Sequence, residues 1–141
     1  MDAKTYFENA KKAAIARDAL ICELQSLNNG DVLTGVSYDG VHSHGDSQTS
    51  IVGMIERKDK SRETIAALES VLDDALVVLY GDGVPGGVAK RLGTLYADVV
   101  CAHWLELQSW RKIAAQFECS QSWCRMIADK TFAYLDKVRR F

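Results

Sequence analysis

The sequence predicts an all-α protein, in which a long helical hairpin is followed by a helix-turn-helix module. Along two long stretches, apolar residues recur at alternating steps of three and four, which is the spacing of one helix face. No stretch shows the strict alternation of apolar and polar residues that marks a half-buried strand. Near the C-terminus, two shorter helical patterns flank a tight turn.

The first long helix is predicted from about Tyr6 to Leu27. Asparagine and glycine tolerate the left-handed backbone that closes a helix, so the Asn-Asn-Gly-Asp run at 28–31 is predicted to end it. The residues that follow are polar and carry glycines and serines, and a loop is expected over 28–49. The predicted seam of the helix consists of Tyr6, Ala10, Ala13, Arg17, Leu20, Leu24 and Leu27.

The second long helix is predicted from about Thr49 to Tyr80. Its charged residues, concentrated in 56–63, supply a polar side. Two long amphipathic helices in succession imply an antiparallel, coiled-coil-like hairpin over 1–80. The predicted apolar stripe of the second helix consists of Ile51, Ile55, Ile65, Leu68, Leu72, Leu76 and Leu79.

The stretch 81–87 breaks the helical pattern, because it holds four glycines and the one proline of the chain. We interpret it as a linker and as the domain boundary. The module after it is expected to occupy 88–141. It opens with a helix predicted over about Val88 to Leu107.

The first helix of the predicted helix-turn-helix begins after Ser109, a residue that can cap a helix N-terminus. Its expected inner face consists of Ile113, Ala114 and Phe117. The small side chain of Ala114 lets the next helix cross closely. Glu118 and Cys119 are predicted to form the turn.

The second helix of the motif is predicted to begin after Ser120, which can again act as the cap. Its expected buried residues are Cys124, Ile127, Thr131 and Leu135. The outward-facing residues near its positive N-terminal end are Gln121, Ser122, Arg125 and Met126. In a helix-turn-helix, these positions face base edges in the major groove of duplex DNA.

The C-terminal stretch resembles region four of bacterial sigma factors, and more closely the small phage-encoded sigma-like regulators of late genes. The resemblance covers about the last 40 residues, and the stretch from Ala102 to Trp110 also looks like the family's approach to the motif. The chain has Gln121 where many sigma factors carry a basic residue, and Met126 where they carry a polar one. The matching residues are Trp110, Ile113, Ala114, Phe117, Cys119, Ser120, Cys124, Arg125, Ile127, Lys130 and Leu135.

The resemblance implies a transcription regulator of phage or prophage origin, with double-stranded DNA and bacterial RNA polymerase as partners. A homodimer stays open, because part of the hairpin seam can pair with a second copy. Nothing in the chain resembles the sigma region that melts promoter DNA, so an activator or accessory factor is expected. The residues predicted to contact DNA are Arg111, Lys112, Ser120, Gln121, Ser122, Trp123, Arg125, Met126 and Lys130.

The charge distribution supports a DNA contact confined to the C-terminus. The formal net charge of the chain is −2 at pH 7, which does not suit a general polyanion binder. The last 35 residues, however, hold seven basic and three acidic side chains, a net charge of +4. The rest of the chain therefore carries −6, and the basic charge is concentrated in the module.

The sequence offers little for catalysis or a cofactor, and we expect neither a bound metal nor an enzyme. The His-x-His-x-Asp string of His42, His44 and Asp46 occurs at some hydrolase metal sites, but only His103 remains as a further imidazole. The four scattered cysteines are expected to be small buried hydrophobes.

The N-terminus lacks a secretion signal and no apolar run approaches the length of a membrane span, so the expected location is the cytoplasm, with the nucleoid. Two alternatives to a sigma-like regulator stay open. One is the small subunit of a DNA-packaging terminase, which also joins a helix-turn-helix to a helical hairpin. The other is a protein-interaction module with a degenerate helix-turn-helix.

Overall fold

The computed structural model describes residues 1–37, 47–81 and 87–141, and the side chains of 1–27, 53–81 and 87–141. These residues form helices joined by short connections, with no strand among them, which confirms the all-α prediction. No helix in the part that the structure describes is both long and apolar enough to cross a membrane.

The two long helices extend further toward each other in sequence than predicted. Helix α1 spans Ala3–Ser37 and helix α2 spans Ser47–Tyr80. The predicted helix end at 28–31 is therefore wrong, and so is the predicted loop over 28–49 where it covers 28–37 and 47–49. The rest of that predicted loop, 38–46, lies outside the described residues. Asparagine and glycine permit a left-handed backbone but do not impose it, and one glycine inside a helix costs only about 1 kcal/mol relative to alanine.

The predicted seam of α1 is confirmed, because each of its seven residues is buried or half-buried. The predicted stripe of α2 is confirmed at Ile65, Leu68, Leu72 and Leu79, which are buried or half-buried, and is wrong at Ile55 and Leu76, whose side chains are 54% and 38% exposed. The side chain of Ile51 lies outside the described residues. Apolar residues occupy more than one face of α2, and packing selects the face with the more regular steps of four and three. The seam observed on α2 consists of Met54, Lys58, Ser61, Ile65, Leu68, Leu72, Ala75 and Leu79.

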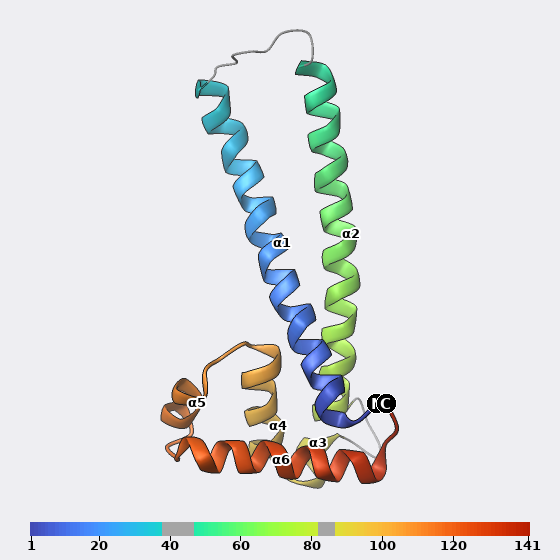
Figure 1. The fold of residues 1–141 in the computed structure, drawn as a ribbon, viewed down its shortest axis with the longest axis vertical. Helices are drawn as coiled ribbons and strands as arrows, with labels where there is room; N and C mark the ends of the chain where they lie inside the picture. Colours follow the sequence, from blue (N-terminus) through green and yellow to red (C-terminus); the bar gives the residue numbers. More distant parts are fainter. Residues whose placement is uncertain (38–46, 82–86) are drawn as a thin grey trace. The chain divides into compact units, whose positions relative to one another are not determined.

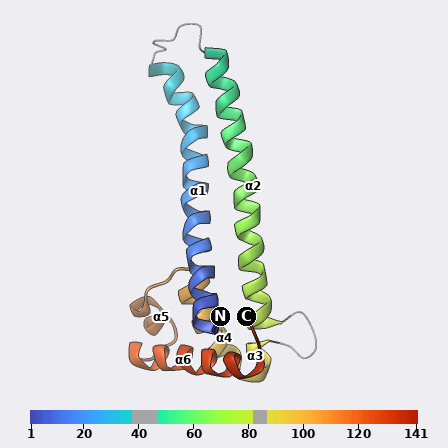
Figure 2. The same cartoon turned by 45° about the vertical axis from the view of Figure 1, so that its right-hand side comes forward.

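The described residues form two compact units that divide the chain differently from the linker predicted at 81–87. Unit 1 contains Met1–Ile15 and Glu69–Phe141, and unit 2 contains Ala16–Leu68. The ends of the long helices thus group with the C-terminal helices rather than with a separate hairpin domain. Within unit 2, the remaining parts of α1 and α2 run antiparallel in both views (Figure 1, Figure 2).

Unit 1 joins residues from both ends of the chain. The rings of Phe7 and Phe132 lie with their centroids 5.6 Å apart, and the indole Nε1 of Trp104 donates a hydrogen bond to Glu8 Oε1 at 3.1 Å. The two chain ends lie close together (Figure 1), and the ring of Phe141 lies 4.4 Å from that of Tyr6. The N-terminal turns of α1 therefore belong to the core of the C-terminal helices.

The stretch from 88 to 107 contains several short helices instead of the single helix predicted. Helix α3 spans Val88–Arg91, helix α4 spans Thr94–Val100, and a π-helical turn, η1, spans Cys101–Leu105. Gly93 separates α3 from α4 with a φ of 128°, which a helix cannot contain. Leu107, with a φ of 59°, turns the chain away after η1.

The last two helices are α5, Trp110–Gln116, and α6, Gln121–Val138. They pack on each other and on α4 and η1 around one apolar cluster. Its buried members are Val99, Ala102, Ile113, Ala114, Cys124 and Ile127.

Candidate nucleic-acid interface

Two serines begin the last two helices, as the sequence predicts. The Ser109 hydroxyl accepts a hydrogen bond from the backbone N–H of Lys112 at 3.2 Å. The Ser120 hydroxyl accepts one from the backbone N–H of Trp123 at 3.1 Å. Each cap satisfies a backbone N–H that has no partner inside its helix, and it fixes where the helix starts.

The predicted turn at Glu118 and Cys119 is confirmed, and its geometry is that of a Schellman motif. Glu118 adopts a left-handed backbone with a φ of 55°. The N–H of Cys119 donates to the carbonyl oxygen of Ala114 at 3.0 Å, and the N–H of Glu118 donates to that of Ala115 at 3.4 Å. These bonds close α5 and set the direction in which the chain enters α6.

The inner faces of α5 and α6 are those predicted, since all the expected core positions are buried except Phe117, which is half-buried. The Thr131 hydroxyl is also buried, and it donates to the carbonyl oxygen of Ile127 at 2.9 Å. Because this hydrogen bond replaces the one that the hydroxyl would make to water, its burial leaves no unsatisfied polar group. The orientation of α6 about its own axis is therefore fixed by packing.

The outer face of α6 carries all the residues predicted to contact DNA from this helix. The Trp123 side chain is 39% exposed and that of Met126 is 41% exposed, although both are large and apolar. Arg111 and Lys112 are exposed at the start of α5. The remaining exposed residues of this set are Ser120, Gln121, Ser122, Arg125 and Lys130.

The cations on this face are available to an external anion. In the part of the chain that the structure describes, Arg111, Lys112, Arg125 and Lys130 have no carboxylate within the 4.0 Å of an ion pair. A guanidinium or ammonium group that is not already paired can contact a phosphate or a base without first breaking an internal ion pair. The arrangement therefore provides a basic, partly apolar surface around the N-terminal half of α6.

An aromatic stack that the sequence did not reveal lies behind Arg125. The guanidinium carbon of Arg125 lies 5.8 Å from the ring centroid of Trp110, within the range of a cation–π contact. On the ring of Trp110 lies the imidazole of His103, with centroids 4.1 Å apart and an interplanar angle of 15°. Trp104 meets Trp110 edge to face at 5.6 Å. Arg125 thus has an aromatic support that restricts its side chain without using its N–H donors.

The hydrogen bonds of His103 indicate its tautomer. Nδ1 lies 2.9 Å from the carbonyl oxygen of Gln108, which can only accept, so Nδ1 carries the proton. Nε2 then accepts from the Lys11 ammonium at 3.3 Å. Burial, and in second place the Lys11 charge, lower the pKa of His103 against the opposing effect of the Gln108 carbonyl. The folded structure therefore favours the neutral imidazole of His103.

The sequence alone does not predict this aromatic stack. Of the two tryptophans, Trp104 is buried and Trp110 is half-buried. A histidine seven residues before a tryptophan does not reveal that the two rings stack, because the left-handed Leu107 between them sets the geometry. The contact with Arg125 depends further on the turn between α5 and α6.

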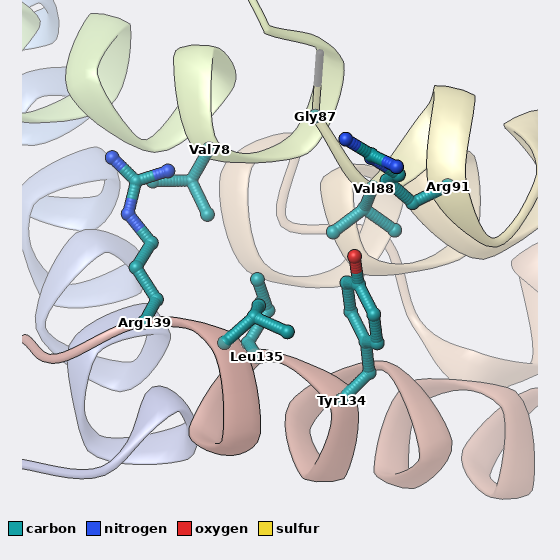
Figure 3. A pocket seen from close by; sticks show the side chains of 8 residues that line it. Val78, Gly87, Val88, Arg91, Tyr134, Leu135 and Arg139 are labelled. Atoms are coloured by element: carbon teal, nitrogen blue, oxygen red, sulfur yellow. The ribbon is translucent and has the colours of Figure 1, made fainter. Parts of the chain in front are cut away.

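A cavity of about 440 Å³ lies at the other end of α6 (Figure 3). The guanidinium groups of Arg91 and Arg139 lie on opposite sides of it, and the Tyr134 hydroxyl points toward the side of Arg91. Its lining residues are Val78, Gly87, Val88, Arg91, Tyr134, Leu135, Val138 and Arg139. None of the predicted DNA-contacting residues lines it, so the cavity is distinct from the candidate interface.

Gly87 permits the close approach of two chain segments beside this cavity. A Cβ added at Gly87 would lie 2.6 Å from the carbonyl group of Leu79 and from the backbone nitrogen of Gly81. No side chain fits at that distance from backbone atoms. The residue at this position must therefore be glycine.

Metal-ligating groups do not gather among the described residues, where no cluster of three or more His, Cys, Asp or Glu side chains is suited to a metal ion. His42, His44 and Asp46, the candidate metal string, lie outside the described residues. The expectation that the cysteines are buried is confirmed for Cys101 and Cys124, whereas Cys22 is exposed and Cys119 half-buried.

Comparisons with protein-family models, with curated proteins and with solved structures find no match. The geometry and charge of the α5–α6 surface are therefore what indicate a function for this chain.

Proposed function

We propose that this chain is a sequence-specific DNA-binding regulator of transcription, in which α5 and α6 act as a helix-turn-helix. The observation that carries the proposal is the outer face of the N-terminal half of α6. There, polar, basic and apolar side chains are exposed together on a helix whose start and axial rotation are fixed by Ser120 and by its buried face.

The N-terminal half of α6 is suited to the major groove. A recognition helix enters the groove with its first turns toward the base edges. Gln121 and Ser122 can exchange hydrogen bonds with bases, and Met126 can contact a thymine methyl group. The indole of Trp123 can pack on a sugar or a thymine methyl group.

Arg125 is the residue to which we assign the most specific contact. A bidentate arginine–guanine pair contributes about 1–3 kcal/mol of discrimination against other bases. The Trp110 ring under the guanidinium limits the rotamers of Arg125 before binding, and such preorganisation lowers the entropy lost on binding. This support favours a base contact over a loose phosphate contact.

Phosphate contacts are assigned to the cations around this helix. Arg111 and Lys112 lie at the exposed start of α5, and Lys130 lies further along α6. Such contacts fix the register of the protein on the duplex without reading its sequence. The Ser120 hydroxyl accepts from Trp123 as the cap and can still donate its own proton to a phosphate oxygen.

A second anchor is part of the proposal. A module with a net charge of +4 makes few phosphate contacts, so one copy alone should bind weakly and lose affinity as salt rises. Bacterial RNA polymerase, implied by the sigma-like resemblance, or a second copy of the chain would supply the missing affinity through effective concentration. Phage or prophage origin belongs to the same resemblance.

The test begins with selection of bound sequences from a random duplex pool by the full chain. Binding to the selected duplex, and to single-base variants of it, is then measured by fluorescence anisotropy for the wild type and Arg125→Ala. We expect Arg125→Ala to bind the selected duplex about 5–150-fold more weakly and to lose discrimination at one base pair.

The matched control is Arg62→Ala, which removes the same charge from an exposed position on α2 and should leave binding unchanged. A wild-type chain that enriches no sequence and binds no duplex would overturn the proposal. Equal weakening of Arg125→Ala on every base-pair variant would contradict the base contact. Assembly of the wild type into a ring in solution would favour the terminase alternative.

A further inference from the structure

The sulfur atoms of Cys119 and Cys124 lie 2.9 Å apart, although both residues are free thiols. Cys119 lies in the turn directly after the left-handed Glu118 and is half-buried. Cys124 lies in the second turn of α6 and is fully buried. The caps and the turn described above hold both residues, so the contact follows from fixed backbone on each side.

We propose that Cys119 and Cys124 are a site of reversible oxidative modification, at which a hydroperoxide converts the two thiols into an intramolecular disulfide. The bond length of a disulfide is about 2.05 Å, so the sulfur atoms need to approach by only about 0.9 Å. Small χ1 rotations supply a movement of this size. Neither Cys22 nor Cys101 is recorded within contact distance of another thiol in the part of the chain that the structure describes.

The two cysteines take different parts in the reaction. Cys119 is reachable from solvent, so after losing its thiol proton its sulfur attacks the peroxide: an S–O bond forms and the O–O bond breaks. The hydroxide or alkoxide that is released takes up that proton and leaves as water or an alcohol. The Cys119 sulfur is oxidised by two electrons to a sulfenic acid. The Cys124 sulfur then attacks it, the S–S bond forms, and the S–O bond breaks. The released hydroxide takes the proton of Cys124 and leaves as water.

Burial suits Cys124 to the second step and not to the first. The lack of solvent around it, together with the neighbouring Cys119 thiol, raises the pKa of Cys124 to about 11. A buried protonated thiol does not react with a dissolved peroxide. Once a sulfenic acid forms next to it, the short distance between the sulfur atoms replaces the need for a reactive thiolate.

The bond would join the turn to the helix that carries the exposed α6 face. Ser120, the cap of α6, lies inside the ring that it closes. Any effect of oxidation on DNA binding rests on the proposed function, whereas formation of the disulfide does not.

Peptide mass mapping of the full chain tests the proposal directly. Purified, reduced protein is treated with hydrogen peroxide, denatured in iodoacetamide and digested with trypsin. Cleavage after Lys112 and Arg125 releases the peptide 113–125, which contains both cysteines and no other. We expect this peptide to lose two hydrogen atoms and both alkylation sites after oxidation, and to regain both sites after treatment with dithiothreitol.

Three variants separate the proposal from general thiol oxidation. Cys22→Ser should leave the mass change intact. Cys124→Ser should leave a sulfenic acid on Cys119 that dimedone traps, and Cys119→Ser should leave Cys124 unmodified. Since Cys124 is in the core, unfolding of Cys124→Ser would leave Cys119→Ser as the deciding variant. A wild-type peptide that stays doubly alkylated, or a Cys119 that proceeds to the sulfinic acid with Cys124 alkylated, would overturn the proposal.

Discussion

The helix pair α5–α6 and unit 2 differ in how completely their helices bury apolar surface. The inner face of α5–α6 closes on a fully buried cluster, with a serine cap at the start of each helix. None of the described side chains of unit 2 is buried, and its seam residues are half-buried. Burial of apolar surface supplies most of the stability of helices in proteins, so we infer that α5–α6 is more stable than unit 2.

The largest expected effect on stability comes from truncating a side chain in the buried cluster between α5 and α6. Ile113 is fully buried, so Ile113→Ala should lower the free energy of unfolding by about 2–5 kcal/mol. Ile65→Ala, on the half-buried seam of α2, should cost about 1 kcal/mol. Urea unfolding followed by circular dichroism measures both. Equal losses would mean that the two regions do not differ in the way described.

The cap of α6 gives the next largest effect. Ser120→Ala removes the acceptor for the Trp123 N–H and should lower the free energy of unfolding by about 1 kcal/mol. Ser122→Ala is the control, because Ser122 is exposed on the same turn and should change stability by less than about 0.5 kcal/mol. Thermal unfolding of the two variants compares them, and identical melting temperatures would exclude the capping role.

A smaller effect of opposite sign is expected at the turn. A left-handed backbone costs a residue other than glycine roughly 1–2 kcal/mol, and glycine avoids this cost. Part of the gain is offset, because glycine has more conformational freedom in the unfolded chain and loses it on folding. Glu118→Gly should therefore stabilise the protein by about 0.5 kcal/mol. Glu63→Gly, inside α2, should instead cost about 1 kcal/mol. Destabilisation by Glu118→Gly would contradict the Schellman geometry.

The smallest expected effect is a pH dependence of the free energy of unfolding that arises from His103. Its pKa is lowered in the folded protein, so the unfolded chain binds this proton first as pH falls. The stability that neutral His103 contributes is present above its ordinary pKa of 6.5 and is lost as pH falls through 6.5 toward the folded value. His103→Gln should flatten the fall in stability between about pH 7 and pH 5. Parallel pH profiles for both proteins would contradict a lowered pKa of His103 in the folded protein.

The sequence predicted α5 and α6 well because their signals are local. A serine directly before a segment of helical periodicity identifies each cap, and apolar residues spaced three and four apart identify each inner face. The helix break at Gly93 was missed, since one glycine is compatible with either a helix or a turn. Ile55 and Leu76 of α2 were wrongly placed on the seam for a different reason: apolar residues occur on several faces of this helix, and only packing distinguishes them.

The sequence predicted the exposed residues of the candidate site but not the aromatic contacts behind them. Exposure of Gln121, Ser122 and Arg125 follows from helix periodicity once the buried face is known. The stack of His103 on Trp110 requires the left-handed turn between them. The bond between Trp104 and Glu8 joins residues far apart in the chain, and no local pattern encodes it.

Site-specific photo-crosslinking tests the central claim, contact of the outer face of α6 with duplex DNA, most directly. A photo-crosslinking amino acid replaces Met126 on α6 or, in a second protein, Ile55 in unit 2; the native side chains at these positions are 41% and 54% exposed. After irradiation with a labelled pool of random duplexes, we expect DNA attached at position 126 and none at position 55. Attachment only at position 55, or at neither position, would contradict the claim.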